Sequence, residues 1–263
     1  MGTASWKKRE KKPYSFIIPF LGFVVLLLVW DVLARYSGWS RQVFPGPVVV
    51  MMSMGELVAN GMLLKHTVAS LFRVTVGFYL AALLGIPLGI FLGMMKTASS
   101  LINPLIQFLR PISPLAWIPL AMLWFGIGDP PAIFLIFLSS FFPLVVSTAI
   151  AVGGINPTYF HVAANFNFSR FDTITRLVIP AIIPEVVTAL RMTVTISWLV
   201  VVAAEMIAVQ SGLGFLILDS RNALRMDYVM DGMIVIGLVG LTLDYLMRQL
   251  GTLDVASWRQ TGS

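Results

Sequence analysis

The chain has 263 residues, of which 58% are hydrophobic and only 11% are charged, and its formal net charge is +6. Soluble domains average about 45–50% apolar and about 25% charged residues, so this composition excludes an ordinary water-soluble enzyme. The sequence has no cysteine, which excludes a disulfide framework or a thiolate metal site, and its two histidines, His66 and His161, are far apart. We therefore expect no metal and no cofactor on this chain.

Long apolar blocks dominate the sequence. Each holds about 20 residues or more, the length that an α-helix needs to cross ~30 Å of hydrocarbon, whereas the strands of a membrane barrel alternate in polarity over about ten residues. We therefore predict an all-α polytopic membrane protein with about six transmembrane helices. Its parts are a basic N-terminal segment at residues 1–14, one transmembrane domain at 15–250 and a tail at 251–263.

A cluster of basic residues precedes the first apolar block. Its members are Lys7, Lys8, Arg9, Lys11 and Lys12. Because basic flanks stay on the cytoplasmic side of a membrane, they place the N-terminus in the cytoplasm, and the first span runs from Ser15 to Arg35. No small-residue cleavage site closes this run, so we expect a retained helix rather than a signal peptide. The sequence has no patch in which basic and aromatic residues alternate in a soluble segment, so we do not expect it to bind nucleic acid.

The next two segments differ in polarity. Residues 37–65 are too polar to span, and their pattern predicts a short amphipathic helix at the outer membrane surface. The second span, from Thr67 to Met95, carries Gly85, Gly89 and Gly93 at regular spacing. One face of this helix therefore lacks side chains, and another helix can approach it closely.

Prolines interrupt the third span, which runs from Leu101 to Phe125. They are Pro104, Pro111, Pro114 and Pro119, and each removes a backbone donor, so the helix must bend or unwind. Such backbone either lines a transport path or belongs to a kinked packing helix. Within it, Arg110 is a planar cation that suits an oxyanion substrate; alternatively it reaches the membrane surface or pairs with an acid such as Glu205.

The fourth span, from Ala132 to Val152, leads to a loop that holds large apolar side chains. Asn156 is a good N-cap and Pro157 suits the first helical position, so a short helix should cover about residues 156–170. Its aromatic residues are Tyr159, Phe160, Phe166 and Phe168. On a segment too short to span, they indicate either a protein partner in the cytoplasm or a helix that lies on lipid.

The fifth and sixth spans cover about Leu177 to Ala208 and about Met230 to Met247. An even number of spans returns the C-terminus to the cytoplasm. Gly212 and Gly214 permit a sharp re-entrant turn between the two spans. Glu205, which precedes them, serves either an ion pair that fixes the helix or contact with substrate.

The loop after the fourth span resembles the cytoplasmic loop of ABC importer permeases, whose motif is Glu-Ala-Ala, three residues, Gly, nine residues and Ile-x-Leu-Pro. Ala163 stands in the second Ala place, Asn167 in the Gly place, and residues 177–180, LVIP, at the closing end. His161 replaces the usual Glu. Because Asn tolerates a left-handed backbone better than most residues, we expect the turn at Asn167 to persist.

Further segments resemble permeases of the nitrate, sulfonate, taurine and bicarbonate group. They are residues 109–120, LRPISPLAWIPL, 123–129, LWFGIGD, 202–207, VAAEMI, and 211–215, SGLGF. The resemblance implies a type I ABC importer permease fold and import of a small anionic solute across the bacterial inner membrane. It also implies three partners in a lipid bilayer: a second permease copy, a separate ATPase that binds ATP and magnesium, and a periplasmic or lipid-anchored solute-binding protein.

Two sets of residues are candidates for function. By the resemblance, the ATPase would contact Tyr159, Phe160, His161, Ala163, Phe166, Asn167 and Arg170. The substrate path would include Arg110, Pro111, Ser113, Trp117, Glu205, Gly212 and Gly214. We expect no catalytic residue, because the Lys-Thr pair at Lys96 and Thr97 lacks the preceding glycine of a phosphate-binding loop.

An ion-coupled secondary carrier is the main alternative, because such carriers also use broken helices and buried carboxylates. This alternative would explain Asp231 and Asp244 in the last span better. It gives the aromatic cytoplasmic helix no role, and six spans without an evident repeat are few for that class. An intramembrane enzyme is disfavoured, because the sequence has no His-Glu-x-x-His, no Gly-x-Ser-x-Gly and no convincing pair of catalytic carboxylates.

Overall fold

The computed structural model describes residues 17–40 and 42–258, and the regular elements within these ranges are all helices. Four helices there are long and apolar enough to cross a membrane, or five if one bent pair is counted as a span. The four are α3 (Met62–Met94), α6 (Asp129–Gly153), α9 (Ile179–Ala208) with the helical turns before it, and α11 (Met226–Trp258). The predicted all-α membrane fold is confirmed, although the described residues give four or five such helices rather than six.

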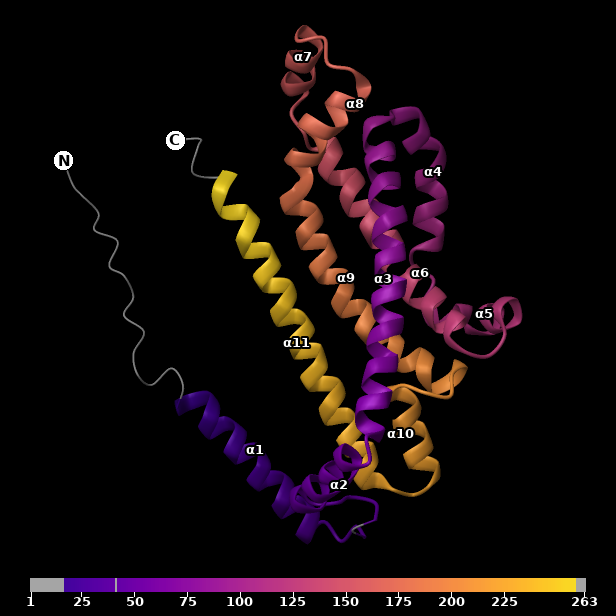
Figure 1. The fold of residues 1–263 in the computed structure, drawn as a ribbon, viewed down its shortest axis with the longest axis vertical. Coiled ribbons are helices and arrows are strands. Elements are labelled where there is room, and N and C mark those ends of the chain that lie inside the picture. Colours follow the sequence, from indigo (N-terminus) through magenta and orange to yellow (C-terminus); the bar gives the residue numbers. More distant parts are fainter. Residues whose placement is uncertain (1–16, 41, 259–263) are drawn as a thin grey trace, which may run out of the picture.

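The bent pair is the predicted third span, and it is broken as its prolines require. α4 (Lys96–Leu109) ends just before Pro111, and a single 3-10 turn, η2 (Pro114–Trp117), leads into α5 (Ile118–Phe125). The two parts meet at an angle of 86°. In Figure 1, α4 runs alongside α3, whereas α5 turns sideways out of the bundle.

The centre of the bundle is made by α3, α6 and α9. The glycines of α3 lie directly against α6, as their spacing predicts. A Cβ atom on Gly89 would lie 2.6 Å from the Cβ of Thr148, and one on Gly93 would lie 2.5 Å from the Cβ of Val152. Any side chain at these positions would therefore push the two helices apart.

Shorter helices gather at one end of the bundle, which we call the α10 end (Figure 1). They are α1 (Ile17–Tyr36), α2 (Pro47–Ala59) and α10 (Leu213–Asn222). Here Arg225 donates to Asp227 at 2.8 Å and to Glu56 at 3.4 Å, and so ties α2 to the start of α11. The hydrogen bond to Asp227 raises the pKa of Arg225 above its usual value.

Several predicted boundaries are corrected. α3 begins at Met62, so Lys65 belongs to this helix and not to the surface segment before it. α4 begins at Lys96, before the predicted start of the third span at Leu101. α11 continues to Trp258, well into the predicted tail at 251–263. The predicted N-terminal segment at residues 1–14 lies outside the described residues.

Candidate functional site

The predicted loop helix exists and lies at the end of the bundle opposite α10, which we call the α7 end (Figure 1). This helix, α7 (Pro157–Asn165), begins as its sequence predicts: the Asn156 side chain accepts a hydrogen bond from the Thr158 backbone N–H at 2.9 Å. Asn167 follows the helix with φ of 54°. The left-handed turn expected where the family has glycine is therefore made by asparagine.

α7 presents its large side chains to two different surroundings. Tyr159 and Phe166 are 59% and 73% exposed. Ala163 is buried, and Phe160 packs on the cluster formed by Val152, Val178 and Ile182 of the spans below. The sequence analysis grouped Phe160 with Tyr159 and Phe166 as rings that would contact a partner or lipid. In the structure Phe160 faces the bundle instead.

The residues after α7 extend its exposed surface. α8 (Arg170–Asp172) carries Phe171, which is 74% exposed. Ser169 caps this turn by accepting from the Asp172 backbone N–H at 3.1 Å. The side chains of His161 and Arg170 are also exposed. We call Tyr159, Phe166 and Phe171 the α7 aromatic surface.

An ionic network toward the α10 end is centred on the buried Arg73 and Glu205 and reaches the half-exposed Asp129. The Arg73 side chain is only 2% exposed. Its guanidinium donates to Glu205 Oε1 at 2.6 Å, to Asp129 Oδ1 at 2.8 Å, and to both the backbone oxygen, at 2.8 Å, and the hydroxyl of Ser211. Arg73 thereby links α3, α6, α9 and the turn before α10. We call these four residues together with Ser70 the Arg73 network.

Glu205 is the acceptor at the centre of this network and is fully buried. It also accepts hydrogen bonds from the Ser70 hydroxyl at 2.9 Å and the Gly214 backbone N–H at 3.0 Å. Gly212 has φ of 104°, and a Cβ there would overlap the Glu205 carboxylate. Only glycine fits this position, because its backbone is left-handed and its side-chain space is already filled.

The structure separates two groups of residues that the sequence placed on one substrate path. Glu205 belongs to the Arg73 network, and Gly212 and Gly214 lie directly against its carboxylate, so Glu205 pairs with Arg73 and not with Arg110. Arg110 comes directly after α4, where the break in the third span begins. Among the described residues it forms no salt bridge. It lines a groove between α4 and α6.

The remaining predicted path residues surround the break in the third span. Pro111 and Ser113 are exposed, and Ser113 immediately precedes the 3-10 turn. Trp117 packs against a buried cluster that includes Ile118 and Ala204. These residues therefore shape the bend, and Arg110 stands beside it.

Sequence reasoning missed most of the polar partners. Asp129, Ser70 and Ser211 were not singled out, although Arg73 and Glu205 are opposite charges within apolar spans and so needed partners. The polar residues of α4 were also missed, although their helical spacing was readable. Within the part of the chain that the structure describes, no group of three or more His, Cys, Asp or Glu side chains could hold a metal ion.

Comparison with known proteins identifies the family. Residues 85–253 match the family model described as the binding-protein-dependent transport system inner membrane component. The chain is 35% identical to a nitrate import permease protein of Synechocystis sp., with 94% of each chain covered. It is 32% identical to a putative aliphatic sulfonates transport permease protein of Bacillus subtilis, with 97% of this chain and 92% of that protein covered.

Solved structures agree on the fold. A chain of a bacterial ABC transporter involved in the import of the acidic polysaccharide alginate superposes with a TM-score of 0.64 at 16% identity, covering 91% of this chain and 93% of that chain. A chain of the MetNI methionine ABC transporter in an inward-facing conformation gives a TM-score of 0.58 at 15% identity, covering 72% and 95%. The chain therefore belongs to the family of binding-protein-dependent transport system inner membrane components, the permease subunits of ABC importers.

Proposed function

We propose that this chain is the subunit through which an ATP-driven importer passes a small anion, and that a separate ATPase docks on the α7 aromatic surface. The exposure of Tyr159, Phe166 and Phe171 carries the proposal. Large aromatic side chains are the residue type that most often dominates the binding energy of protein interfaces. Tyr159 is on α7, Phe166 caps its C-terminus and Phe171 is on α8, and both short helices lie at the α7 end of the bundle (Figure 1).

The anchoring of α7 supports coupling between this partner and the membrane helices. Phe160 packs on Val152 of α6 and on Ile182 of α9, so the helix is seated on two spans. A displacement of α7 by the ATPase is therefore passed to α6 and α9. Nucleotide binding shifts the transporter between conformations only if the ATPase holds one of them more tightly, and α7 is where that difference acts.

Membership of the family supports the following assembly as part of the proposal. A second copy of the chain completes the membrane part, ATP and magnesium bind the ATPase, and a periplasmic or lipid-anchored protein delivers the solute. In the bacterial inner membrane, the α7 end and both chain termini then face the cytoplasm. The relatives named for nitrate and aliphatic sulfonates support a small anion as the solute, and so does the unpaired Arg110.

The test is a pair of double variants in the full chain, expressed with the ATPase that copurifies from native membranes. Tyr159→Ala with Phe166→Ala removes two exposed rings from α7. Phe20→Ala with Tyr36→Ala removes the same ring types from α1, where they are 68% and 82% exposed. Both the amount of ATPase recovered and the ATP-dependent uptake of nitrate or ethanesulfonate into membrane vesicles are measured.

We expect the α7 variant to weaken ATPase binding about 30-fold or more, since the loss of an interface hot spot costs about 2 kcal/mol, and to lose uptake. The α1 variant should keep both. Phe160→Ala serves as a second control, because its ring packs inward and its loss should lower the thermal stability of the chain. Normal ATPase recovery and normal uptake in the α7 variant would rule out the proposed docking surface.

One observation favours the alternative of an ion-coupled carrier. Asp231 of α11 is fully buried, and neither of its carboxylate oxygens has a hydrogen-bond partner among the described residues. The neighbouring Ser53 hydroxyl donates to the Val50 backbone oxygen instead. Uptake that needs a proton gradient, persists without ATP and disappears in Asp231→Asn would support the carrier; ATP-driven uptake in Asp231→Asn would support the importer.

A further inference from the structure

Besides the groove between α4 and α6, a second groove lies at the α7 end, between the last turns of α3 and the segment that leads into α9. Its volume is about 660 Å³, which is in the range of sites for small molecules. α3 contributes lining residues from Pro87 to Met95. The other wall is made by Arg170, Ile174 and Ile179, which belong to α8, to the π-helical segment before α9 and to α9. We call this space the α3–α9 groove.

The walls of the α3–α9 groove are apolar apart from Arg170. Phe91, Met95 and Ile179 are 46%, 46% and 39% exposed, so this apolar lining is open to the surroundings of the bundle. Met94 also lines the groove, and flexible methionine side chains adapt to ligands of irregular shape. The groove therefore suits a flexible hydrocarbon chain better than a polar solute.

The groove reaches from the membrane surface into the hydrocarbon. α3 has 33 residues, which at about 1.5 Å per residue make it about 50 Å long. This length exceeds the ~30 Å of the hydrocarbon core, so the end of α3 at Met95 reaches the headgroup region. Pro87, at the other end of the lining, lies about 12 Å further along the helix. A ligand in the groove can therefore keep its head at the membrane surface and its tail in the apolar region.

One cation lies at the α7 end of the groove. Arg170 is exposed and, among the described residues, forms no salt bridge. Asp172, two positions along the chain, is already engaged, because it pairs with Arg176 at 3.2 Å and accepts a hydrogen bond from the Ser169 hydroxyl. The Arg170 guanidinium is thus available to an external anion, and it can hold a phosphate through two parallel N–H groups.

We propose that the α3–α9 groove binds an anionic phospholipid, whose acyl chain lies between α3 and α9 and whose phosphate binds Arg170. Basic pockets between membrane helices at the cytoplasmic surface bind the headgroups of anionic lipids in other proteins. The inference goes beyond the proposed function and does not depend on it, because lipid binding needs neither ATP nor a transported solute.

The N-terminal helix α1 is the other apolar segment to consider as an occupant, from this chain or from a second copy. α1 leads to α2 at the α10 end, so its N-terminal end points toward the α7 end (Figure 1). Five basic residues precede that end in the sequence, and they are Lys7, Lys8, Arg9, Lys11 and Lys12. Seating α1 in the groove would bring these charges toward Arg170, and like charges placed together are costly. A phosphate brings the opposite charge, so charge complementarity favours the lipid.

The floor of the groove is shared with α7. Ile90 and Met94 line the groove and also pack on the buried cluster around Val178, on which Phe160 of α7 is seated. A bound lipid therefore supports the side chains that hold α7 in place. We expect an anionic lipid to stabilise this end of the bundle.

The native chain has no cysteine, so one fluorophore can be attached at a chosen position. Leu83→Cys carries bimane on α3 one turn before Pro87, beside the groove but not lining it. Leu101→Cys carries it on α4, outside the groove. The two native leucines are 69% and 80% exposed. Each purified full-length variant is placed in nanodiscs that contain phosphatidylcholine and phosphatidylglycerol in a fixed proportion. Only one of the two lipids carries brominated acyl chains, which quench bimane.

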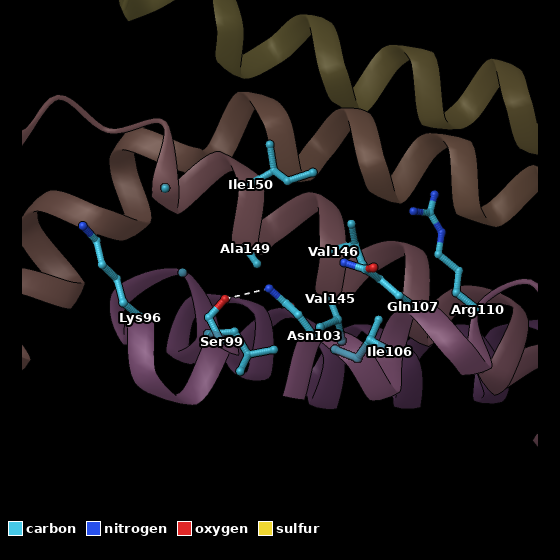
Figure 2. A pocket seen from close by; sticks show the side chains of 13 residues that line it. Lys96, Ser99, Asn103, Ile106, Gln107, Arg110, Val145, Val146, Ala149 and Ile150 are labelled. Carbon is cyan, nitrogen blue, oxygen red and sulfur yellow. Dashed lines mark hydrogen bonds between the residues drawn. The ribbon is translucent and has the colours of Figure 1, made fainter. Parts of the chain in front are cut away.

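For bimane at Leu83→Cys we expect an about tenfold preference for phosphatidylglycerol per brominated lipid, which corresponds to about 1.4 kcal/mol. Adding Arg170→Gln should remove this preference. Adding Lys96→Gln should keep it. Lys96 is also an exposed cation without a salt bridge in the described part of the chain, but it lines the groove between α4 and α6 (Figure 2). Bimane at Leu101→Cys should be quenched equally by the two lipids.

An equal response to the two lipids at Leu83→Cys, or no quenching by either lipid there, would overturn the proposal. So would a preference that survives Arg170→Gln, that is lost equally in Lys96→Gln, or that is as strong at Leu101→Cys, because the lipid would then respond to the overall surface charge. The readout uses neither ATP nor solute. Failure of the uptake and copurification assays therefore leaves this test unchanged, and failure of this test leaves the importer in place.

Discussion

Two arginines in this membrane protein have opposite surroundings. Arg73 is buried in α3 and donates to Glu205, Asp129 and Ser211, so its guanidinium is fully engaged within the chain. Arg110 lies at the end of α4 beside a groove and, within residues 17–40 and 42–258, has no acidic partner. Arginine thus occurs once as a residue that joins helices through ion pairs and once as a cation without a salt bridge among the described residues.

The comparison shows what a charge in an apolar span does. Such a charge costs about 2.5–3.5 kcal/mol on insertion scales unless it has a partner or water. Arg73 meets this need through three other segments of the chain, which are α6, α9 and the turn before α10. Arg110 instead lies among the polar residues Ser99, Asn103 and Gln107, which line the same groove between α4 and α6. The two arginines therefore differ in whether other segments of the described chain supply their partners.

The largest expected effect comes from breaking the Arg73 network. Arg73→Met leaves the Glu205 carboxylate buried without its cation, and removing one partner of a buried ion pair costs about 3–5 kcal/mol. Thermal unfolding in detergent, followed by size-exclusion chromatography, measures the loss. The double variant Arg73→Met with Glu205→Met should be more stable than the single variant, because no uncompensated charge remains. A single variant as stable as the native chain would contradict the tying role.

A smaller loss is expected from Gly212→Ala. The added methyl group would overlap the Glu205 carboxylate, and the left-handed backbone at φ of 104° is strained for any residue with a side chain. Such backbone strain costs about 1–3 kcal/mol. Gly237→Ala is the matched control, because no atom lies within 4 Å of its Cβ position. Equal unfolding temperatures for the two variants would show that Gly212 is not constrained.

Asp231→Asn tests whether a buried carboxylate stabilises the fold when it has no hydrogen-bond partner. Glu205 and Asp231 are both fully buried, but only Glu205 has hydrogen-bond partners in the described residues. We therefore expect Asp231→Asn to change the unfolding free energy by less than about 1 kcal/mol, since no hydrogen bond is lost. Glu205→Gln, assayed in parallel, should be clearly destabilised. If both variants lost a similar unfolding free energy, the hydrogen bonds of Glu205 would not be what distinguishes it from Asp231.

The smallest effect on stability is expected for Arg110→Gln. Substitutions away from packed or paired groups usually change stability by about 0.5 kcal/mol or less, and Arg110 has no salt bridge to lose. Anion uptake should nevertheless fall about tenfold, which corresponds to a barrier increase of about 1.4 kcal/mol. A marked drop in the unfolding temperature with unchanged uptake would assign Arg110 to structure instead.

Much of the fold could be predicted because its signals are local. The apolar blocks predict the long helices, the glycines of α3 predict the close contact with α6, and the prolines predict the break after α4. The N-cap at Asn156 and the left-handed turn at Asn167 were also correct. Each of these features depends on residues that are neighbours in the sequence or on the same helix.

The candidate site was predicted only in part. Tyr159, Phe166 and Arg170 are exposed at the α7 end as the loop pattern indicates, but Phe160 turns inward. The sequence left Glu205 between an ion pair that fixes the helix and contact with substrate, and the structure pairs it with Arg73. The partner of a charge can come from any helix, and Arg73 is separated from Glu205 by 132 positions.

By itself, the sequence determined that this chain lies in a membrane, that it is helical and where its helices bend, because hydrophobicity and backbone preferences act over short stretches of chain. Only the tertiary structure decided which charges meet. Side-chain pairing in an apolar medium depends on the relative depth and rotation of helices that are distant in sequence. Arg73 and Arg110 are alike in sequence terms, but their neighbours in space join Arg73 to acids on two other helices and leave Arg110 without a salt bridge among the described residues.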